Sequence, residues 1–196
     1  MRGWAWLVLA PAGAVALASP AVASAEDRLR AGVKDIALAG GYSLTLKRRN
    51  TEDVEGFHRI PHLGYFLTDE RGSGWLRGNF EALAEPTVIH LRAESQSATV
   101  VGLAALGRWV FATSWSVRPF VEAGVGILGG QVDFRQTNCD VNFILQGGVG
   151  ALVFVSESMA VTAGLRVHHV SNADSCSKNV GLNSGLFILG LSYFFP

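Results

Sequence analysis

The apolar residues of this chain fall into eight separate segments, and this division constrains the fold more than any other feature of the sequence. Many segments are rich in β-branched, aromatic or glycine residues, and several alternate between apolar and polar residues with a period of two. Such alternation is typical of β-strands with one apolar face. The pattern predicts strands at about 33–47, 57–68, 74–85, 97–112, 118–132, 142–155, 159–171 and 184–195.

The alternation gives each predicted strand one apolar face and one face of charges, amides and glycines. In the seventh segment Leu165 and Val167 share the apolar face with His169 and Ser171, whereas Arg166 lies on the opposite face. The third, fifth and eighth segments divide in the same way. Their apolar faces carry Leu76, Phe80, Ala82, Val121, Ala123, Val125, Ile127, Phe187, Leu189, Leu191, Tyr193 and Phe195.

The polar faces point to a membrane protein. The interior of an eight-stranded barrel is just wide enough for side chains, so we expect Arg77, Glu81, Glu122 and Arg166 to pair inside, away from lipid. Closure of the barrel satisfies the backbone hydrogen bonds within hydrocarbon. We therefore predict an all-β fold, an eight-stranded antiparallel transmembrane β-barrel. The alternatives are a secreted β-sandwich and a soluble lipocalin-type barrel, which would hold its apolar face inside.

The beginning of the chain has the pattern of a secretory signal peptide. Arg2 precedes an apolar stretch at 4–18, and small residues at 23–25 form a cleavage site. The alternative is an N-terminal membrane anchor, but the stretch is shorter than the roughly 20 residues of a spanning helix and prolines interrupt it. We expect the leader, 1–25, to be removed and the outer-membrane β-barrel domain to occupy 26–196.

The charge balance limits the partners of this chain. Its 196 residues include 16 basic and 16 acidic ones, and only 16% are charged, against roughly 25% in an average soluble domain. A nucleic-acid partner is not expected, because binding to nucleic acid requires a basic excess. An export signal followed by a barrel predicts a multi-pass protein of the Gram-negative cell outer membrane, in contact with outer-membrane lipids.

Strand order predicts which connections face outward. If the mature N-terminus is periplasmic, the connections after odd-numbered strands lie outside the cell, and those after even-numbered strands are short. The short connection near 156–158 fits this rule. A basic run, Lys47 to Arg49, ends the first strand as a solvated rim or as a contact for lipopolysaccharide phosphates. The predicted outer loops are 48–56, 86–96, 133–141 and 172–183.

Two cysteines, Cys139 and Cys176, fall in predicted outer loops. An oxidising exterior favours a disulfide between them, and the alternative is two free thiols. Neither cysteine has a base at a spacing suited to nucleophilic chemistry. His58 and His62 lack a cluster of carboxylates or cysteines at zinc spacing, so we expect no metal and no other cofactor.

One short motif near the C-terminus can carry chemistry. His169 and Ser171 lie two residues apart on a predicted strand and point to the same, apolar face. A histidine beside a serine is the minimal activated nucleophile. The loop that leads to the antiparallel eighth strand brings Asn183 onto the parity of that strand's apolar face, so Asn183 can approach His169, whereas His168 points to the interior. The alternative is a set of interfacial polar residues without chemistry.

The segments 118–126 and 164–173, which read RPFVEAGVG and GLRVHHVSNA, resemble the PagL family of outer-membrane lipid A 3-O-deacylases. The resemblance extends from Pro119 to Phe195. It implies a serine esterase that acts on lipid A or lipopolysaccharide in the outer leaflet and releases a 3-hydroxy fatty acid. It also implies Ser171 as nucleophile, His169 as general base, and Asn172 with backbone N–H groups of the next loop, including that of Asp174, as oxyanion hole. A homodimer stays open.

This sequence departs from the PagL pattern at two positions of the site. Asn183 stands where the family has a glutamate as the third member of the triad; an amide can orient the imidazole but cannot stabilise its charge. Asp174 stands where the family has a glycine, and it is an alternative third member. Two other functions remain open: a catalytically silent structural or adhesive barrel, and an outer-membrane phospholipid acyl hydrolase.

Overall fold

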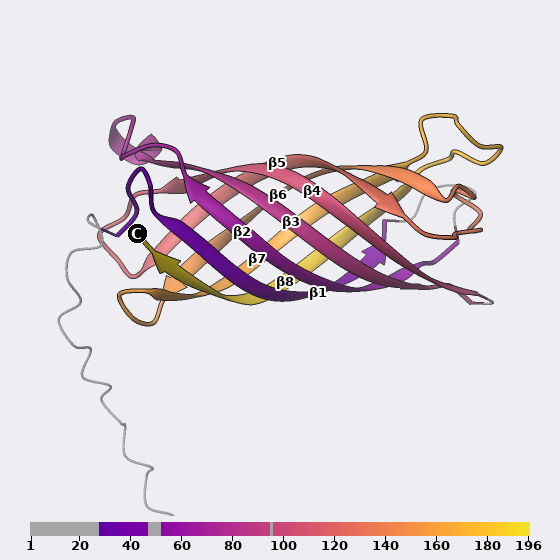
Figure 1. Ribbon diagram of the computed structural model, residues 1–196, viewed down its shortest axis with the longest axis horizontal. Helices are drawn as coiled ribbons and strands as arrows, with labels where there is room; N and C mark the ends of the chain where they lie inside the picture. Colours follow the sequence, from indigo (N-terminus) through magenta and orange to yellow (C-terminus); the bar gives the residue numbers. More distant parts are fainter. Residues whose placement is uncertain (1–27, 47–51, 95) are drawn as a thin grey trace, which may run out of the picture.

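The computed structural model describes residues 28–46, 52–94 and 96–196 as a closed antiparallel β-barrel (Figure 1). Each strand pairs with its sequence neighbours, and β1 pairs with β8, which confirms the predicted fold. The predicted leader and the basic run at 47–49 lie outside the described residues. The elements are β1 Lys34–Thr45, β2 Glu55–Phe66, the 3-10 helix η2 Gly74–Leu76, β3 Gly78–Arg92, β4 Ser97–Phe111, β5 Val117–Gly129, β6 Val141–Phe154, β7 Met159–Ser171 and β8 Leu182–Phe195.

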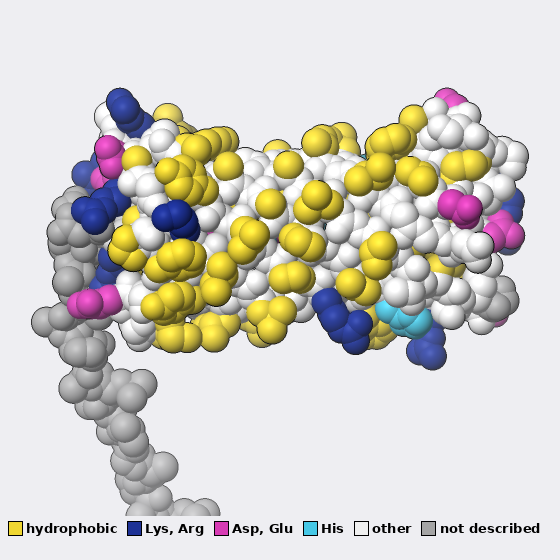
Figure 2. Space-filling model, viewed as in Figure 1, with side chains coloured by type: hydrophobic (Ala, Val, Ile, Leu, Met, Phe, Trp, Pro, Cys, Tyr) yellow, Lys and Arg dark blue, Asp and Glu magenta, His cyan; other side chains and the backbone are white. Residues whose placement is uncertain are grey.

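The two faces of the strands separate as the alternation predicts. Leu165 and Val167 point outward with 59% and 54% of their surface exposed, whereas Arg166 between them is 4% exposed. Apolar side chains cover the wall of the barrel, and charged side chains gather mainly toward its two ends (Figure 2). An exposed apolar wall with a polar interior is the arrangement of a barrel that lies in lipid. In the described part of the chain, no helix is long and apolar enough to cross a membrane.

The interior of the barrel holds charges that pair with one another. Arg108 contacts Glu81 at 3.1 Å and Glu122 at 3.0 Å, and Arg166 reaches the other oxygen of Glu122 at 2.5 Å. Arg166 also donates two hydrogen bonds to Glu85, at 2.6 and 2.7 Å. Removal of one member of such a buried network costs about 3–5 kcal/mol, because its partner is left charged and unpaired. The network therefore fills the lumen between β3, β4, β5 and β7.

The third strand differs from its prediction at its start. The expected strand began at residue 74, but the chain turns there into η2, with positive φ at Gly72 (84°) and Gly74 (58°). Arg77 consequently precedes β3 and pairs with Glu70 at 3.3 Å, with 44% of its side chain exposed. The expectation that Arg77 lies in the interior was therefore wrong, because the alternation was applied to a turn. The β2–β3 connection, 67–77, is also longer than the short one expected.

The same strand also ends later than predicted. The expected loop at 86–96 is reduced to 93–96, since β3 continues through Pro86 to Arg92. Its ladder with β4 is continuous, with Pro86 opposite Leu103. Its ladder with β2 lapses between Arg59 and Leu63, where Pro61 and Pro86 fall and no proline N–H can donate. Pairing with β4 on one side thus allows β3 to continue past Pro86, although a proline usually ends a strand.

The two ends of the barrel are built differently. The C-terminus and the β2–β3, β4–β5 and β6–β7 connections lie at one end, here called the terminus end, at the left of Figure 1. The other end, here called the loop end, carries the connections 130–140 and 172–181. Phe134 of the first of these loops is 1% exposed and packs in an apolar cluster with Val132 and Val170. The loop end is therefore closed by its own loops, and it contains the residues of the predicted site.

Candidate active site

His169 and Asn183 meet because their strands pair in register. The β7–β8 ladder places the two residues directly opposite each other on the outward face, and His169 Nδ1 lies 2.9 Å from Asn183 Oδ1. An amide oxygen can only accept a hydrogen bond, so Nδ1 carries the proton. The lone pair of Nε2 is then available to accept a proton, as a general base requires.

Ser171 lies on the same outward face as His169, at the last position of β7. It is partly buried and stands opposite Phe143 of β6, whose side chain is 46% exposed on the wall of the barrel. Among the described contacts, no hydrogen bond joins the Ser171 hydroxyl to His169. The two side chains are therefore neighbours along one face without a direct link between them.

Gly181 is a position to which the sequence reasoning assigned no role. Its φ is +80°, and an added Cβ would lie 2.7 Å from Cε1 of His169. The backbone of the β7–β8 loop therefore packs directly against the imidazole ring, and only a glycine permits both the conformation and the approach. The available signal was a glycine three residues before the predicted eighth strand.

Asn172 is fully buried, unlike Ser171 beside it. Its Nδ2 donates to Thr137 Oγ1 at 3.1 Å and to the Lys178 carbonyl oxygen at 2.7 Å, and its backbone N–H donates to Asn179 Oδ1 at 3.0 Å. These donors are engaged inside the loop structure. The role of Asn172 in an oxyanion hole stays a prediction and would require its N–H to exchange acceptors.

Asp174 turns away from the imidazole. Its carboxylate accepts a hydrogen bond from Asn179 Nδ2 at 2.8 Å, and Asn183, not Asp174, contacts His169. Ala173 and Asp174 adopt left-handed conformations, with φ of 51° and 61°. No described residue accepts a hydrogen bond from the backbone N–H of Asp174, and the role of this N–H in an oxyanion hole stays a prediction.

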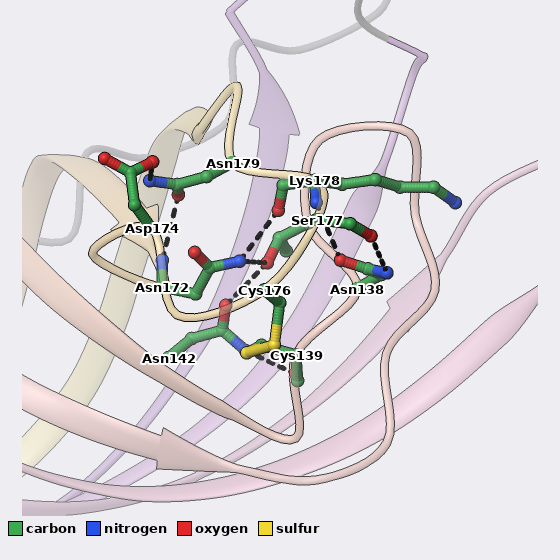
Figure 3. The surroundings of a disulfide bond; sticks show 10 residues. Asn138, Cys139, Asn142, Asn172, Asp174, Cys176, Ser177, Lys178 and Asn179 are labelled. Atoms are coloured by element: carbon green, nitrogen blue, oxygen red, sulfur yellow. Dashed lines mark hydrogen bonds between the residues drawn. A yellow bond between two sulfur atoms is a disulfide. The ribbon is translucent and has the colours of Figure 1, made fainter.

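The structure joins Cys139 and Cys176 in a disulfide, with their Cα atoms 5.7 Å apart. Figure 3 shows the bridge between the loops 130–140 and 172–181, surrounded by a dense set of hydrogen bonds. The loop that follows Ser171 is thus fastened covalently to a neighbouring loop. Elsewhere, His58 and His168 are buried inside the barrel, and the described residues contain no group of histidine, cysteine and acidic side chains that could hold a metal ion.

An apolar groove on the outer wall begins next to the histidine and extends over β1, β6, β7 and β8. Its floor is low at Gly147 and Gly185, where an added Cβ would make ordinary contacts of 3.5 and 3.6 Å. Gly185 follows Asn183 on the same face, as Val167 precedes His169. The raised sides of the groove are formed by Tyr42, Leu44, Leu46, Val149, Leu165, Val167 and Phe187.

Comparison with known proteins identifies the family. A family model described as lipid A 3-O-deacylase (PagL) matches residues 40–192. The chain belongs to the PagL family of lipid A 3-O-deacylases. Membership in a family of hydrolases agrees with the resemblance that segments 118–126 and 164–173 carry.

Solved structures support the fold of this PagL-family chain. The outer membrane enzyme PagL superposes with a TM-score of 0.58 at 19% identity, over 80% of this chain and 97% of that one. Neisserial surface protein A gives 0.55 at 16% identity, over 83% and 96% of the two chains. Identities this low establish only the shared barrel, and no curated protein matches the chain. Together with the family, they place it in the outer membrane.

Proposed function

We propose that this protein hydrolyses the 3-O-linked acyl ester of lipid A in the outer leaflet and releases a 3-hydroxy fatty acid. The observation that carries the proposal is the His169–Asn183 pair, which lies on the outward wall at the loop end, beside an apolar groove. A polar pair on a lipid-facing surface is costly unless it has a function. An ester at the boundary between headgroup and acyl chain would meet the pair from the membrane.

Each residue has a defined task in the proposed reaction. Ser171 Oγ attacks the ester carbonyl carbon while His169 Nε2 takes the hydroxyl proton, which gives a tetrahedral oxyanion. The C–O bond to the sugar then breaks, and the departing sugar oxygen receives the proton from His169. Water, deprotonated by the same nitrogen, hydrolyses the acyl-enzyme and frees the fatty acid. The Ser171 hydroxyl must rotate toward Nε2 for the first step.

Orientation is the contribution of Asn183. Its amide oxygen accepts a hydrogen bond from His169 Nδ1, 2.9 Å away, and thereby fixes the tautomer that leaves Nε2 as the base. A carboxylate at this position would also stabilise the imidazolium, so we expect slower turnover than a glutamate would give. The N–H of Asp174, and that of Asn172 after a change of acceptor, are the oxyanion donors that the resemblance implies.

The apolar groove fits the acyl chain of the substrate. It begins at Gly185 and Val167, one outward position below the pair, so a chain whose ester carbonyl lies at Ser171 can extend along it. Burial of each methylene group contributes about 0.8 kcal/mol. All the groups named here come from one chain, so the reaction does not require the homodimer that the resemblance leaves open.

The test is hydrolysis of lipid A by the refolded protein in detergent, with products identified by mass spectrometry. We expect the loss of one 3-hydroxyacyl group with wild type and roughly a thousandfold or more slower release with Ser171→Ala, because the nucleophile is removed. Ser175→Ala is a matched control, because its exposed side chain lies in the same loop. Phospholipid vesicles form a second arm. A folded wild type that leaves lipid A intact, or that cleaves phospholipid instead, would refute the proposal.

A further inference from the structure

The neighbouring loop, 130–140, supplies the groups that hold the backbone around Ser171. We use the name interloop clamp for Thr137, Cys139, Asn142 and Cys176, which connect this loop and the start of β6 to the loop 172–181. Thr137, Cys139 and Asn142 are at most 6% exposed. The clamp is therefore a part of the protein interior, although it joins two loops at the end of the barrel (Figure 3).

The hydrogen bonds of the clamp form a continuous chain. Asn172 Nδ2 donates to Thr137 Oγ1 at 3.1 Å, and the Thr137 hydroxyl donates in turn to Asn142 Oδ1 at 2.8 Å. Asn142 Nδ2 donates to the Cys139 carbonyl oxygen at 2.8 Å. The disulfide from Cys139 to Cys176 returns the connection to the loop that contains Asn172. The hydroxyl of Thr137 uses both its donor and its acceptor capacity in this chain.

The position of Asn172 determines the direction of Ser171. Consecutive side chains along an extended backbone point to opposite faces, so an Asn172 fixed inside the barrel turns Ser171 outward. The clamp holds Asn172 inside, because its buried Nδ2 donates to Thr137 Oγ1 and to the Lys178 carbonyl oxygen, and a buried donor without an acceptor is costly. Thr137 thus sets the orientation of the predicted nucleophile, Ser171, through its hydrogen bond to the next residue, Asn172.

The same loop also controls the other side of the site. The Gln136 carbonyl oxygen accepts a hydrogen bond from the N–H of Val180 at 2.9 Å, and Thr137 forms an isolated bridge with Asn179. Asn179 and Val180 directly precede Gly181, whose backbone packs against the imidazole of His169. Loop 130–140 therefore fixes both ends of loop 172–181, beside the serine and beside the histidine.

We propose that the interloop clamp is a positioning device for the reaction, in which Thr137 and the Cys139–Cys176 disulfide keep Ser171 and His169 in a productive relation. The proposal rests on the proposed function. Thr137 touches neither the ester nor the imidazole and acts through Asn172. A displacement of about 1 Å in a reacting group costs up to about a hundredfold in rate. Loss of the clamp should therefore lower kcat and leave KM nearly unchanged, because the apolar groove lies on other residues.

The experiment compares Thr137→Val, which keeps the shape but removes the hydroxyl, with Thr137→Ser, which keeps the hydroxyl. A Cys139→Ser/Cys176→Ser double variant and wild type treated with a reductant test the disulfide. For each protein, kcat and KM are measured on lipid A in mixed micelles. Hydrogen–deuterium exchange of the peptide that covers 169–183 reports the order of the loop without any substrate, and the exchange of β3 and β4 reports folding.

We expect Thr137→Val and the disulfide-free proteins to show faster exchange in 169–183 only, with kcat lowered by about tenfold to a hundredfold and KM within about twofold of wild type. Thr137→Ser should keep the exchange rate of 169–183, the kcat and the KM of wild type. If wild type is active and Thr137→Val has an unchanged kcat, the positioning role of the clamp is wrong, although the proposed function stands. The same holds if Thr137→Val raises KM by as large a factor as it lowers kcat. An inactive, folded wild type would overturn the proposed function, and the clamp with it.

Discussion

Serine and histidine side chains lie close together both inside this barrel and on its outer wall, and the two sets differ in almost every other respect. Inside, His58 Nε2 is 2.9 Å from Ser43 Oγ, and both residues are buried. Outside, His169 contacts Asn183, and Ser171 makes no described hydrogen bond to it. The pair with a formed serine–histidine hydrogen bond is thus the one that is sealed from the membrane.

The two pairs also differ in orientation and in access. His58 Nδ1 is buried with no hydrogen-bond partner, and the pair borders an interior cavity lined mainly by apolar side chains such as Ile89 and Val100. His169 has its ring held by Asn183 and stands beside an open groove. The proposed reaction needs an oriented base and a path for the ester, so we expect it at the outer pair.

The largest expected difference comes from replacing each histidine. We expect His169→Gln to lower kcat on lipid A by about a thousandfold, because the general base is removed. His58→Gln should leave kcat within about threefold and lower the resistance to unfolding by urea, since it disturbs a buried hydrogen bond to Ser43. Equal loss of activity in two folded variants would show that the inner pair takes part in the reaction.

Replacement of the orienting amide is next in size. Asn183→Leu should reduce kcat by about a hundredfold, because the imidazole loses the acceptor that fixes its tautomer. Asn183→Glu should restore or exceed the wild-type value, since a carboxylate also stabilises the imidazolium. Ser184→Ala, at the adjacent inward position, is the control for disturbance of the strand. Full activity of Asn183→Leu would mean that His169 needs no third group.

Glycine substitutions separate backbone strain from contact with the imidazole. Gly181 and Gly32 have similar positive φ values, +80° and +90°, but an added Cβ meets His169 only at Gly181 and open space at Gly32. We expect both alanine variants to lose roughly 1–3 kcal/mol of stability. Only Gly181→Ala should also lower kcat, by about tenfold. Parallel kinetics and urea unfolding distinguish the two effects, and a normal kcat for Gly181→Ala would argue against this contact.

The smallest expected effect concerns the groove. Gly185→Val adds side-chain volume to its floor, at a position where the Cβ itself makes an ordinary 3.6 Å contact with Leu46. We expect KM for lipid A to rise by about threefold to tenfold, at a cost of roughly 1 kcal/mol in lost acyl-chain burial, and kcat to stay near wild type. The equivalent change on another wall, Ala84→Val in β3, should have no effect. If Gly185→Val leaves KM unchanged, the acyl chain does not bind in this groove.

Much of this architecture could be predicted from the sequence, because side-chain direction in a strand is a local property. The faces assigned to Arg166, Leu165 and His168 agree with the structure, and the parity of Asn183 leads to its contact with His169. The third strand was misplaced at both ends, since glycines at 72 and 74 build a turn and pairing with β4 extends the strand past Pro86. Turn formation and pairing depend on residues outside the alternating segment.

The sequence alone determined the number of strands, the polar interior and the outward direction of His169 and Ser171, since a period of two is fixed by the covalent geometry of an extended chain. Only the tertiary structure decided the surroundings of the site: Asn172 bound to Thr137, Asp174 turned to Asn179, and Gly181 against the imidazole. The contact between Asn172 and Thr137 joins residues 35 positions apart. Loop conformations of this kind follow from non-local contacts, for which a single sequence has no periodic signal.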